Sequence, residues 1–176
     1  MALAFLLGYL VGGLPVAFWF GALRGKDLLR EGPDFLSALE VLGPVPGLLV
    51  LFLEVFQGAL SVALGEGVAG SPLGGLLGGV GAVWGQAFSP WLLFRGGRAL
   101  APAAGALLAV DPRLLLLALF LFALLYLAFR SPGRAVLAVA LALPLLAALL
   151  GKTPFHLLFG LLVGLPVAFR HLGDPQ

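Results

Sequence analysis

The chain has 176 residues, of which 61% are hydrophobic and only 10% are charged, whereas soluble domains carry about 25% charged residues. So much apolar surface cannot be hidden in one soluble core, so we expect an integral membrane protein. The formal net charge of +2 is too small to indicate a nucleic-acid partner. Cysteine is absent, which excludes disulfides and thiolate chemistry. The two histidines and the scattered carboxylates form no metal-binding pattern, so we expect no metal and no other cofactor.

Apolar segments along the chain predict an all-α membrane domain that occupies residues 1–176 as a single unit. A membrane-spanning helix needs roughly 20 residues, or about 17 at the short end. The segment 99–110 is shorter, so we expect it to begin in the preceding loop, to be shielded by protein, or to be a broken helix. Pro15 should kink the first segment and free carbonyl groups that a neighbouring helix must satisfy. The seven predicted spans are 2–23, 46–64, 73–93, 99–110, 113–130, 135–150 and 154–169.

The basic residues predict how the chain is oriented in the membrane, because lysine and arginine are enriched in short cytoplasmic loops. If the loop 24–45 is cytoplasmic, eight basic residues fall on that side, and only Arg113 and Lys152 fall on the other. The N-terminus is then outside and the C-terminus is cytoplasmic. The eight residues are Arg24, Lys26, Arg30, Arg95, Arg98, Arg130, Arg134 and Arg170.

The loop 24–45 is the longest polar stretch of the chain. Asp34 can cap a short helix over 35–42, and Ser37 and Glu40 would be neighbours on that helix. A loop of this length in a small bundle is either a functional loop beside a substrate or a helix that lies at the membrane interface. Both interpretations are open from the sequence.

Three polar residues interrupt the apolar segments. Glu54 and Gln57 are three positions apart and share one helix face, and Gln86 stands alone in the segment 73–93. An ionisable group inside a span is costly, which makes Glu54 a functional-site hypothesis. The alternative is a protonated or hydrogen-bonded Glu54 that holds helices together.

Two arginines flank two glycines in Arg95-Gly96-Gly97-Arg98. Paired glycines can adopt positive φ and turn their N–H groups inward around an anion. A helix that starts near Ala99 would add its positive N-terminal end, and the guanidinium fork can bind two phosphate oxygens. The pattern predicts a phosphate site at the membrane surface. The alternative is a short cytoplasmic loop whose arginines only fix the topology.

A histidine lies next to an arginine near the end of the last predicted span, at Arg170-His171. On the predicted topology this pair is at the cytoplasmic face, with the other basic loops. A histidine there titrates near neutral pH and could move a proton. The alternative is a terminal histidine that is only solvated.

The order of these motifs resembles the bacterial acyl-phosphate:glycerol-3-phosphate acyltransferases, which are small seven-span membrane enzymes of phospholipid synthesis. The resemblance covers essentially the whole chain. Residues 8–15 are similar to the family's Y-L-x-G-S-x-P, residues 41–48 to V-L-G…G, residues 54–58 to D-x-x-K-G, residues 85–98 to G-H-x-F-P-x-F-x-x-F-K-G-G-K-G, residues 110–112 to L-D-P, and residues 170–171 to R-H.

The chain departs from the family pattern most strongly in its first loop. The family has S-G-N-x-G-A-T-N there, whereas residues 31–39 form a shorter sequence, in which only Ser37 could replace the lost hydroxyl or amide groups. The other replacements are Gln57 for lysine, Gln86 for histidine, Arg95 and Arg98 for two lysines, Ala99 for glycine and Asp174 for asparagine.

The resemblance implies transfer of a fatty acyl group from acyl phosphate to the 1-hydroxyl of glycerol 3-phosphate, in a bacterial inner membrane. Its partners would be these two substrates and membrane lipid, and the oligomeric state stays open. Two alternatives remain, namely a family member without turnover that binds phospholipid or a partner protein, and a small transporter or channel. The implied site comprises His171 and Ser37 as catalytic candidates, and Arg95, Gly96, Gly97, Arg98 and Arg170 as phosphate ligands.

Overall fold

The computed structural model describes residues 1–30, 32–151 and 153–172, so the expectations that involve Glu31, Lys152 and Asp174 lie outside the described residues. Every regular element within these ranges is helical, which confirms the all-α class. The elements are α1 (Ala2–Gly12), α2 (Val16–Ala22), α3 (Phe35–Leu42), α4 (Pro44–Ala69), α5 (Pro72–Ala87), the 3-10 turn η1 (Pro90–Leu92), α6 (Leu100–Val110), α7 (Pro112–Phe129), α8 (Pro132–Leu150) and α9 (Phe155–Leu172).

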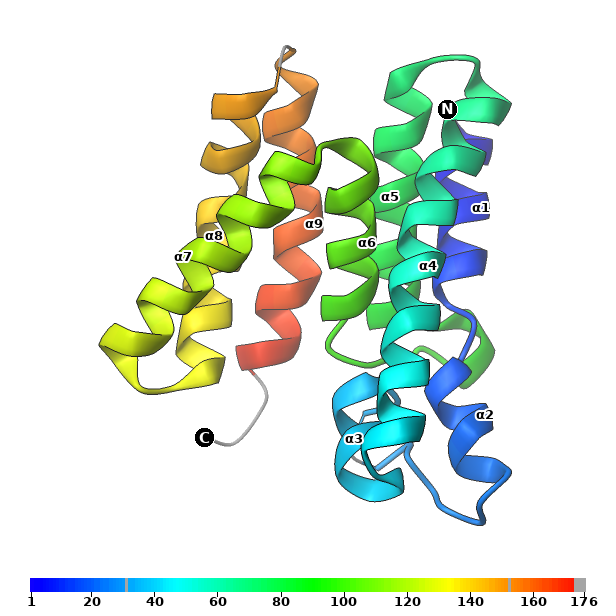
Figure 1. Ribbon diagram of the computed structural model, residues 1–176. Coiled ribbons are helices and arrows are strands. Elements are labelled where there is room, and N and C mark those ends of the chain that lie inside the picture. The colour runs from blue at the N-terminus through cyan, green and yellow to red at the C-terminus, as the bar shows by residue number, and fades with distance from the viewer. Residues whose placement is uncertain (31, 152, 173–176) are drawn as a thin grey trace.

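The long helices form a bundle in which the N-terminus, at Met1, and the C-terminal end of α9 lie at opposite ends (Figure 1). Helix α1 packs against α5 and α4, α4 packs against α5 and α6, and α8 packs against α9 and α7. The short helices α2 and α3 gather at the end of the bundle opposite Met1, and α7 leans away from the others (Figure 1). Helix α3, which carries Ser37, and the last turn of α9, which carries Arg170 and His171, lie at this end (Figure 1).

Five stretches in the described part of the chain are long and apolar enough to cross a membrane, namely Ala2–Ala22, α4, α7, α8 and α9. Helices α5 and α6 have only 16 and 11 residues, which is short of the roughly 20 that a span needs. Most of α6 is buried against its neighbours. Of the alternatives for the segment 99–110, shielding by protein is therefore the one that the structure supports.

The first predicted span is broken at Pro15, as expected, with α1 ending at Gly12 and α2 starting at Val16. Neighbouring elements satisfy the carbonyl groups that the break frees. The Ser89 hydroxyl donates to the Gly13 carbonyl at 2.6 Å. The Gln57 amide donates to the carbonyls of Val11 at 3.1 Å and of Leu14 at 3.3 Å.

The third predicted span, 73–93, was drawn too long, because α5 ends at Ala87. Pro90 has no N–H to donate and disfavours helical geometry at the preceding residue. Leu93 and Phe94 then adopt positive φ, at 53° and 64°. Residues 88–99 consequently form a loop with one 3-10 turn, and this loop carries the two arginines and two glycines to the site.

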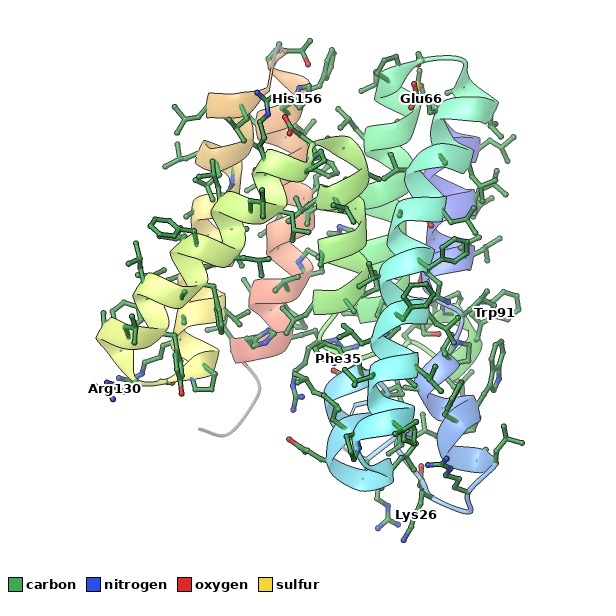
Figure 2. The ribbon with its side chains drawn as sticks, in the orientation of Figure 1. Lys26, Phe35, Glu66, Trp91, Arg130 and His156 are labelled. Carbon is green, nitrogen blue, oxygen red and sulfur yellow. The ribbon has the colours of Figure 1, made fainter. Side chains whose placement is uncertain are left out.

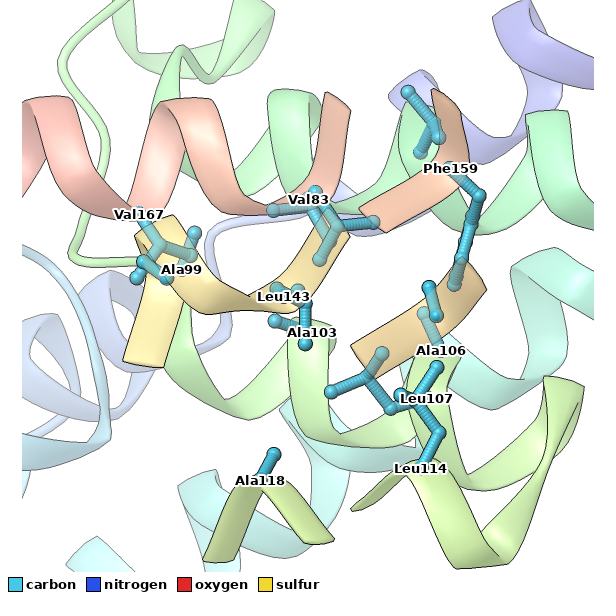
Figure 3. Close-up of a cluster of buried hydrophobic side chains, with 14 of the residues drawn as sticks. Val83, Ala99, Ala103, Ala106, Leu107, Leu114, Ala118, Leu143, Phe159 and Val167 are labelled. Atoms are coloured by element: carbon cyan, nitrogen blue, oxygen red, sulfur yellow. The ribbon is translucent and has the colours of Figure 1, made fainter. Parts of the chain in front are cut away.

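The main core lies among α5, α6, α8 and α9 and consists mostly of small and branched apolar side chains, such as Val83, Ala106 and Leu143, together with the aromatic ring of Phe159 (Figure 3). Large apolar side chains point away from it on α7, where Leu116, Phe120 and Leu127 are each more than 60% exposed. Such an outer surface suits lipid rather than water as the solvent.

Candidate active site

A cavity of about 870 Å³ lies between α6, α7, α8 and α9 and is closed on one side by α3 and by Leu51 of α4. Its volume is within the range of about 300–1,000 Å³ that is usual for ligand pockets. Most of the wall is aliphatic or aromatic. The polar lining residues lie at the end of the bundle that carries α3, where Phe35 and Arg130 are seen in Figure 2. They are Glu40, Arg98, Arg130, Ser131 and His171.

Arg98 is tied to Asp34, which caps α3 as the sequence predicted. The Asp34 side chain accepts the Ser37 backbone N–H at 3.1 Å, and it accepts the Arg98 backbone N–H at 2.9 Å. The Arg98 Nη1 atom lies 3.8 Å from Asp34 Oδ1, and the two side chains are 23% and 3% exposed. The capping residue of α3 thus holds the arginine that reaches the cavity.

The two glycines of the loop do not form the expected anion cradle. Neither Gly96 nor Gly97 adopts a left-handed φ, and the N–H of Gly97 donates to the Gln86 carbonyl at 3.0 Å. The reason for glycine is close packing instead. A Cβ on Gly96 would overlap the carbonyl oxygens of Gln86 and Ala87, and a Cβ on Gly97 would lie 2.6 Å from Asp34 Cβ. The expectation of positive φ at these residues was wrong.

Two of the three polar residues in the apolar segments meet beside this loop. Glu54 is buried and accepts hydrogen bonds from Gln86 Nε2 at 2.9 Å and from the Phe35 backbone N–H at 3.4 Å. Glu54 thereby joins α4 to α5 and to the first turn of α3. Gln57 faces α1 instead, and its buried Oε1 has no hydrogen-bond partner within the described part of the chain.

The basic residues of the predicted site separate into two groups. Arg98 and His171 line the cavity, and His171 Nδ1 lies 2.8 Å from the Val167 carbonyl oxygen. Arg95 is exposed outside the cavity lining. Arg170 donates to the carbonyls of Ala87 and Phe94, so it pins the loop to α9.

Arg170 also lies over an aromatic ring. Its guanidinium carbon is 4.9 Å from the centroid of Phe88, a cation–π distance. Its Nε is buried and finds no hydrogen-bond partner among the residues that the structure describes. The side chain is therefore engaged by the protein on several sides.

Ser37 does not reach the cavity. It is 1% exposed, and its hydroxyl lies 3.3 Å from Asp34 Oδ1, to which it donates. The sequence analysis missed Glu40, Arg130 and Ser131 as cavity residues. The sequence could have indicated them, because each lies near the end of a predicted helix, on the side of the membrane where the basic residues are expected. Within the described residues, no cluster of three or more potential ligands could hold a metal ion.

Comparisons with known proteins show the family to which the chain is similar. Residues 2–176 match the family model described as glycerol-3-phosphate acyltransferase. The glycerol-3-phosphate acyltransferase of Synechococcus sp. (strain JA-3-3Ab) is 38% identical over 173 residues, which cover 96% of this chain and 85% of that protein. The enzyme of that name from Desulforamulus reducens is 30% identical over 93% of this chain and 84% of its own length.

Among solved structures, the fold is similar to the crystal structure of PlsY (YgiH), an integral membrane glycerol 3-phosphate acyltransferase, in its glycerol 3-phosphate form. The TM-score is 0.84 at 22% sequence identity, and the match covers 97% of this chain and 88% of that chain. The lysophosphatidic acid form of the same protein gives a TM-score of 0.83. Because the family model matches residues 2–176, this chain belongs to the glycerol-3-phosphate acyltransferase family.

Proposed function

We propose that this chain is a membrane acyltransferase that moves a fatty acyl group from acyl phosphate to glycerol 3-phosphate and releases lysophosphatidate and phosphate. Family membership supports glycerol 3-phosphate as the acceptor. The observation that carries the proposal for the donor is the cavity, which combines a long apolar wall with a polar end that holds Arg98, Arg130 and His171. An acyl chain suits the wall, and a phosphate group suits the two guanidinium groups.

The reaction needs positioned charge rather than a covalent intermediate. The acceptor hydroxyl oxygen attacks the acyl carbonyl carbon, the bond from that carbon to the phosphate oxygen breaks, and phosphate leaves with the electron pair. The hydroxyl proton passes to His171 or to the departing phosphate. Arg98 neutralises the phosphate charge as it develops, and alignment of the two substrates supplies much of the rate. The buried hydroxyl of Ser37, directed at Asp34, suits a supporting role better than attack on a substrate.

The membrane topology belongs to the same proposal. We infer seven crossings, with α1 and α2 together as one crossing and α4 to α9 as one each, because the chain passes repeatedly between the two ends of the bundle (Figure 1). The end with α3 then faces the cytoplasm of a bacterium, across its inner membrane. Lys26 and Arg130 lie at this end, and Glu66 and His156 lie at the other (Figure 2), in agreement with the bias of basic residues toward the cytoplasm.

The absence of cysteine makes the orientation easy to test. Single variants Lys26→Cys and Glu66→Cys place one thiol at each end of the bundle. With an impermeant thiol reagent on intact cells, Glu66→Cys should be labelled, and Lys26→Cys should react only after the membrane is opened. The reverse pattern would refute the orientation.

The activity test uses the purified protein in lipid nanodiscs with acyl phosphate and glycerol 3-phosphate. Lysophosphatidate and inorganic phosphate should appear in equal amounts. A hydrogen bond to a charged group contributes about 1.5–3 kcal/mol, so Arg98→Ala should raise the KM for acyl phosphate roughly 10-fold to 100-fold. Arg113→Ala, at the opposite end of the bundle, is the matched control and should leave KM unchanged. Folded protein without product would refute turnover.

That last outcome would favour the second candidate, a family member that binds a phospholipid and has no turnover. One observation favours it specifically. Gln86, where the family pattern has histidine, donates to Glu54 rather than to the cavity, and it is absent from the described cavity lining. Retention of lysophosphatidate by a folded, inactive protein would support this candidate.

A further inference from the structure

One carboxylate gathers donors from two separate segments of the chain. Asp34 is 2% exposed, and its Oδ1 accepts the Ser37 backbone N–H at 3.1 Å and the Ser37 hydroxyl at 3.3 Å. Its Oδ2 accepts the Arg98 backbone N–H at 2.9 Å. The Arg98 guanidinium lies on the same carboxylate, with Nη1 3.8 Å from Oδ1. Asp34 therefore joins the first turn of α3 to the residue that precedes the cap of α6.

The backbone of the loop is fitted to this carboxylate. A Cβ on Gly97 would lie 2.6 Å from Asp34 Cβ and 3.1 Å from its Oδ2, so only glycine lets the loop approach so closely. Since the Arg98 N–H is already given to Asp34 and the Gly97 N–H to Gln86, neither is offered to a substrate. The backbone of the loop 95–98, where the sequence suggested a phosphate site, binds the side chain of Asp34 instead.

Asp34 and Arg98 differ in their access to the cavity. Arg98 lines the cavity and its side chain is 23% exposed, whereas the Asp34 side chain is 3% exposed and lies behind it. A buried partner that restricts the rotamers of a ligand-binding group sets the direction of that group and reduces the entropy lost on binding.

We propose that Asp34 is a positioning residue that holds the Arg98 guanidinium at the polar end of the cavity, where it meets the phosphate group of a phosphate-bearing single-chain lipid. Ser37 acts one step further back, by holding Asp34. The proposal rests on the proposed function for the identity of this ligand. Binding and turnover are therefore measured separately.

The test variant is Asp34→Asn. Asparagine caps helices as well as aspartate does, so its single acceptor oxygen can keep the Ser37 contacts of the cap. The charge that attracts the Arg98 guanidinium is removed, and the Arg98 backbone N–H loses the oxygen that now accepts it. The matched control is Asp111→Asn. Asp111 caps α7, accepts the Arg113 backbone N–H at 2.9 Å and pairs with the Arg113 side chain at 2.8 Å, and neither residue is among those that line the cavity.

The probes are lysophosphatidate and monoacylglycerol with the same acyl chain, titrated in detergent micelles and followed by calorimetry. Asp34→Asn should weaken lysophosphatidate binding about tenfold and change monoacylglycerol binding less than twofold. Asp111→Asn should change neither. In turnover, Asp34→Asn should raise the KM for acyl phosphate by the same factor while kcat falls less than threefold. Should Asp34→Asn fail to fold, Ser37→Ala replaces it, with an expected twofold to fivefold loss for lysophosphatidate alone.

The outcomes separate the two proposals. If Asp34→Asn weakens the binding of lysophosphatidate and of monoacylglycerol equally, Asp34 only supports the fold. If Asp34→Asn leaves lysophosphatidate binding unchanged or makes it tighter, Asp34 does not aid Arg98. Either result overturns the inference. Wild-type protein that binds both probes equally well also overturns it. Selective lysophosphatidate binding without product refutes the proposed turnover, and the binding comparison still decides the role of Asp34.

Discussion

Replacing the buried carboxylate of Glu54 by the amide of glutamine should destabilise the protein, because the site offers two donors to this side chain. Gln86 Nε2 and the Phe35 backbone N–H each donate to a different oxygen of Glu54, at 2.9 Å and 3.4 Å. A glutamine side chain has one acceptor oxygen and one NH₂ group. With the Gln86 amide in its present orientation, Glu54→Gln satisfies only one of the two donors, and its own NH₂ group then faces the other. Turning the Gln86 amide over would offer the new NH₂ group an acceptor but would leave Gln86 Nε2 without its bond to position 54.

The size of the effect follows from the number of donors left without an acceptor. An unsatisfied buried donor costs about 1–3 kcal/mol, so Glu54→Gln should cost about 1–3 kcal/mol and Glu54→Leu about 2–6 kcal/mol. The Pro33 carbonyl lies 3.5 Å from Gln86 Nε2 and can accept from it only weakly, so it offsets only a small part of the cost expected for Glu54→Leu.

The assay is thermal unfolding of the purified protein in detergent, followed by tryptophan fluorescence. One kcal/mol corresponds to about 2–4 °C for a chain of this size. Glu66→Gln is the control, because Glu66 is an exposed residue of the same helix, and it should change stability by less than about 0.5 kcal/mol. A Glu54→Gln variant as stable as wild type but inactive would refute the structural role and restore the functional one.

Two further predictions concern packing and pH. Gly58→Ala should destabilise by about 1–3 kcal/mol, because the new Cβ would overlap the Pro102 carbonyl oxygen, whereas Gly67→Ala on the same helix meets nothing within 4 Å and should stabilise by up to about 1 kcal/mol; melting temperatures test both. Hydrogen bonds from Arg113 hold the pKa of Asp111 below its ordinary value of 3.8, so the pair stabilises the folded state above that pH and the contribution is lost as the pH falls through the lowered pKa. The difference in melting temperature between wild type and Asp111→Asn should narrow between pH 6 and pH 3, and a constant difference would contradict this reasoning.

The features that the sequence predicted well depend on local chemistry. The cap at Asp34 and the helix over 35–42 follow from the preference of a carboxylate for the N–H groups at the start of a helix. The break at Pro15 follows in the same way from the missing N–H of proline. The end of α5 was missed by several residues because the run 73–93 is apolar throughout, and only Ser89-Pro90 marks the change.

The site was harder to predict because its contacts join distant parts of the chain. Glu54 and Gln86 are 32 positions apart, and Asp34 and Arg98 are 64 apart. A pattern of residue types shows that a buried carboxylate needs donors, but the packing of α3, α4 and α5 decides which donors it finds. Arg95 and Arg98 look equivalent in sequence, and only the fold turns one outward and the other toward the cavity.

Arg98, where the family pattern quoted in the sequence analysis has lysine, and Asp34 form one physical arrangement. Lysine carries its charge and its three N–H donors on a single ammonium group. The guanidinium of Arg98 spreads its charge over a planar fork with five N–H donors. It can therefore approach Asp34 with Nη1 while its partly exposed surface contributes to the cavity. An internal acid in the first loop is compatible with phosphate binding because the residue it faces is arginine.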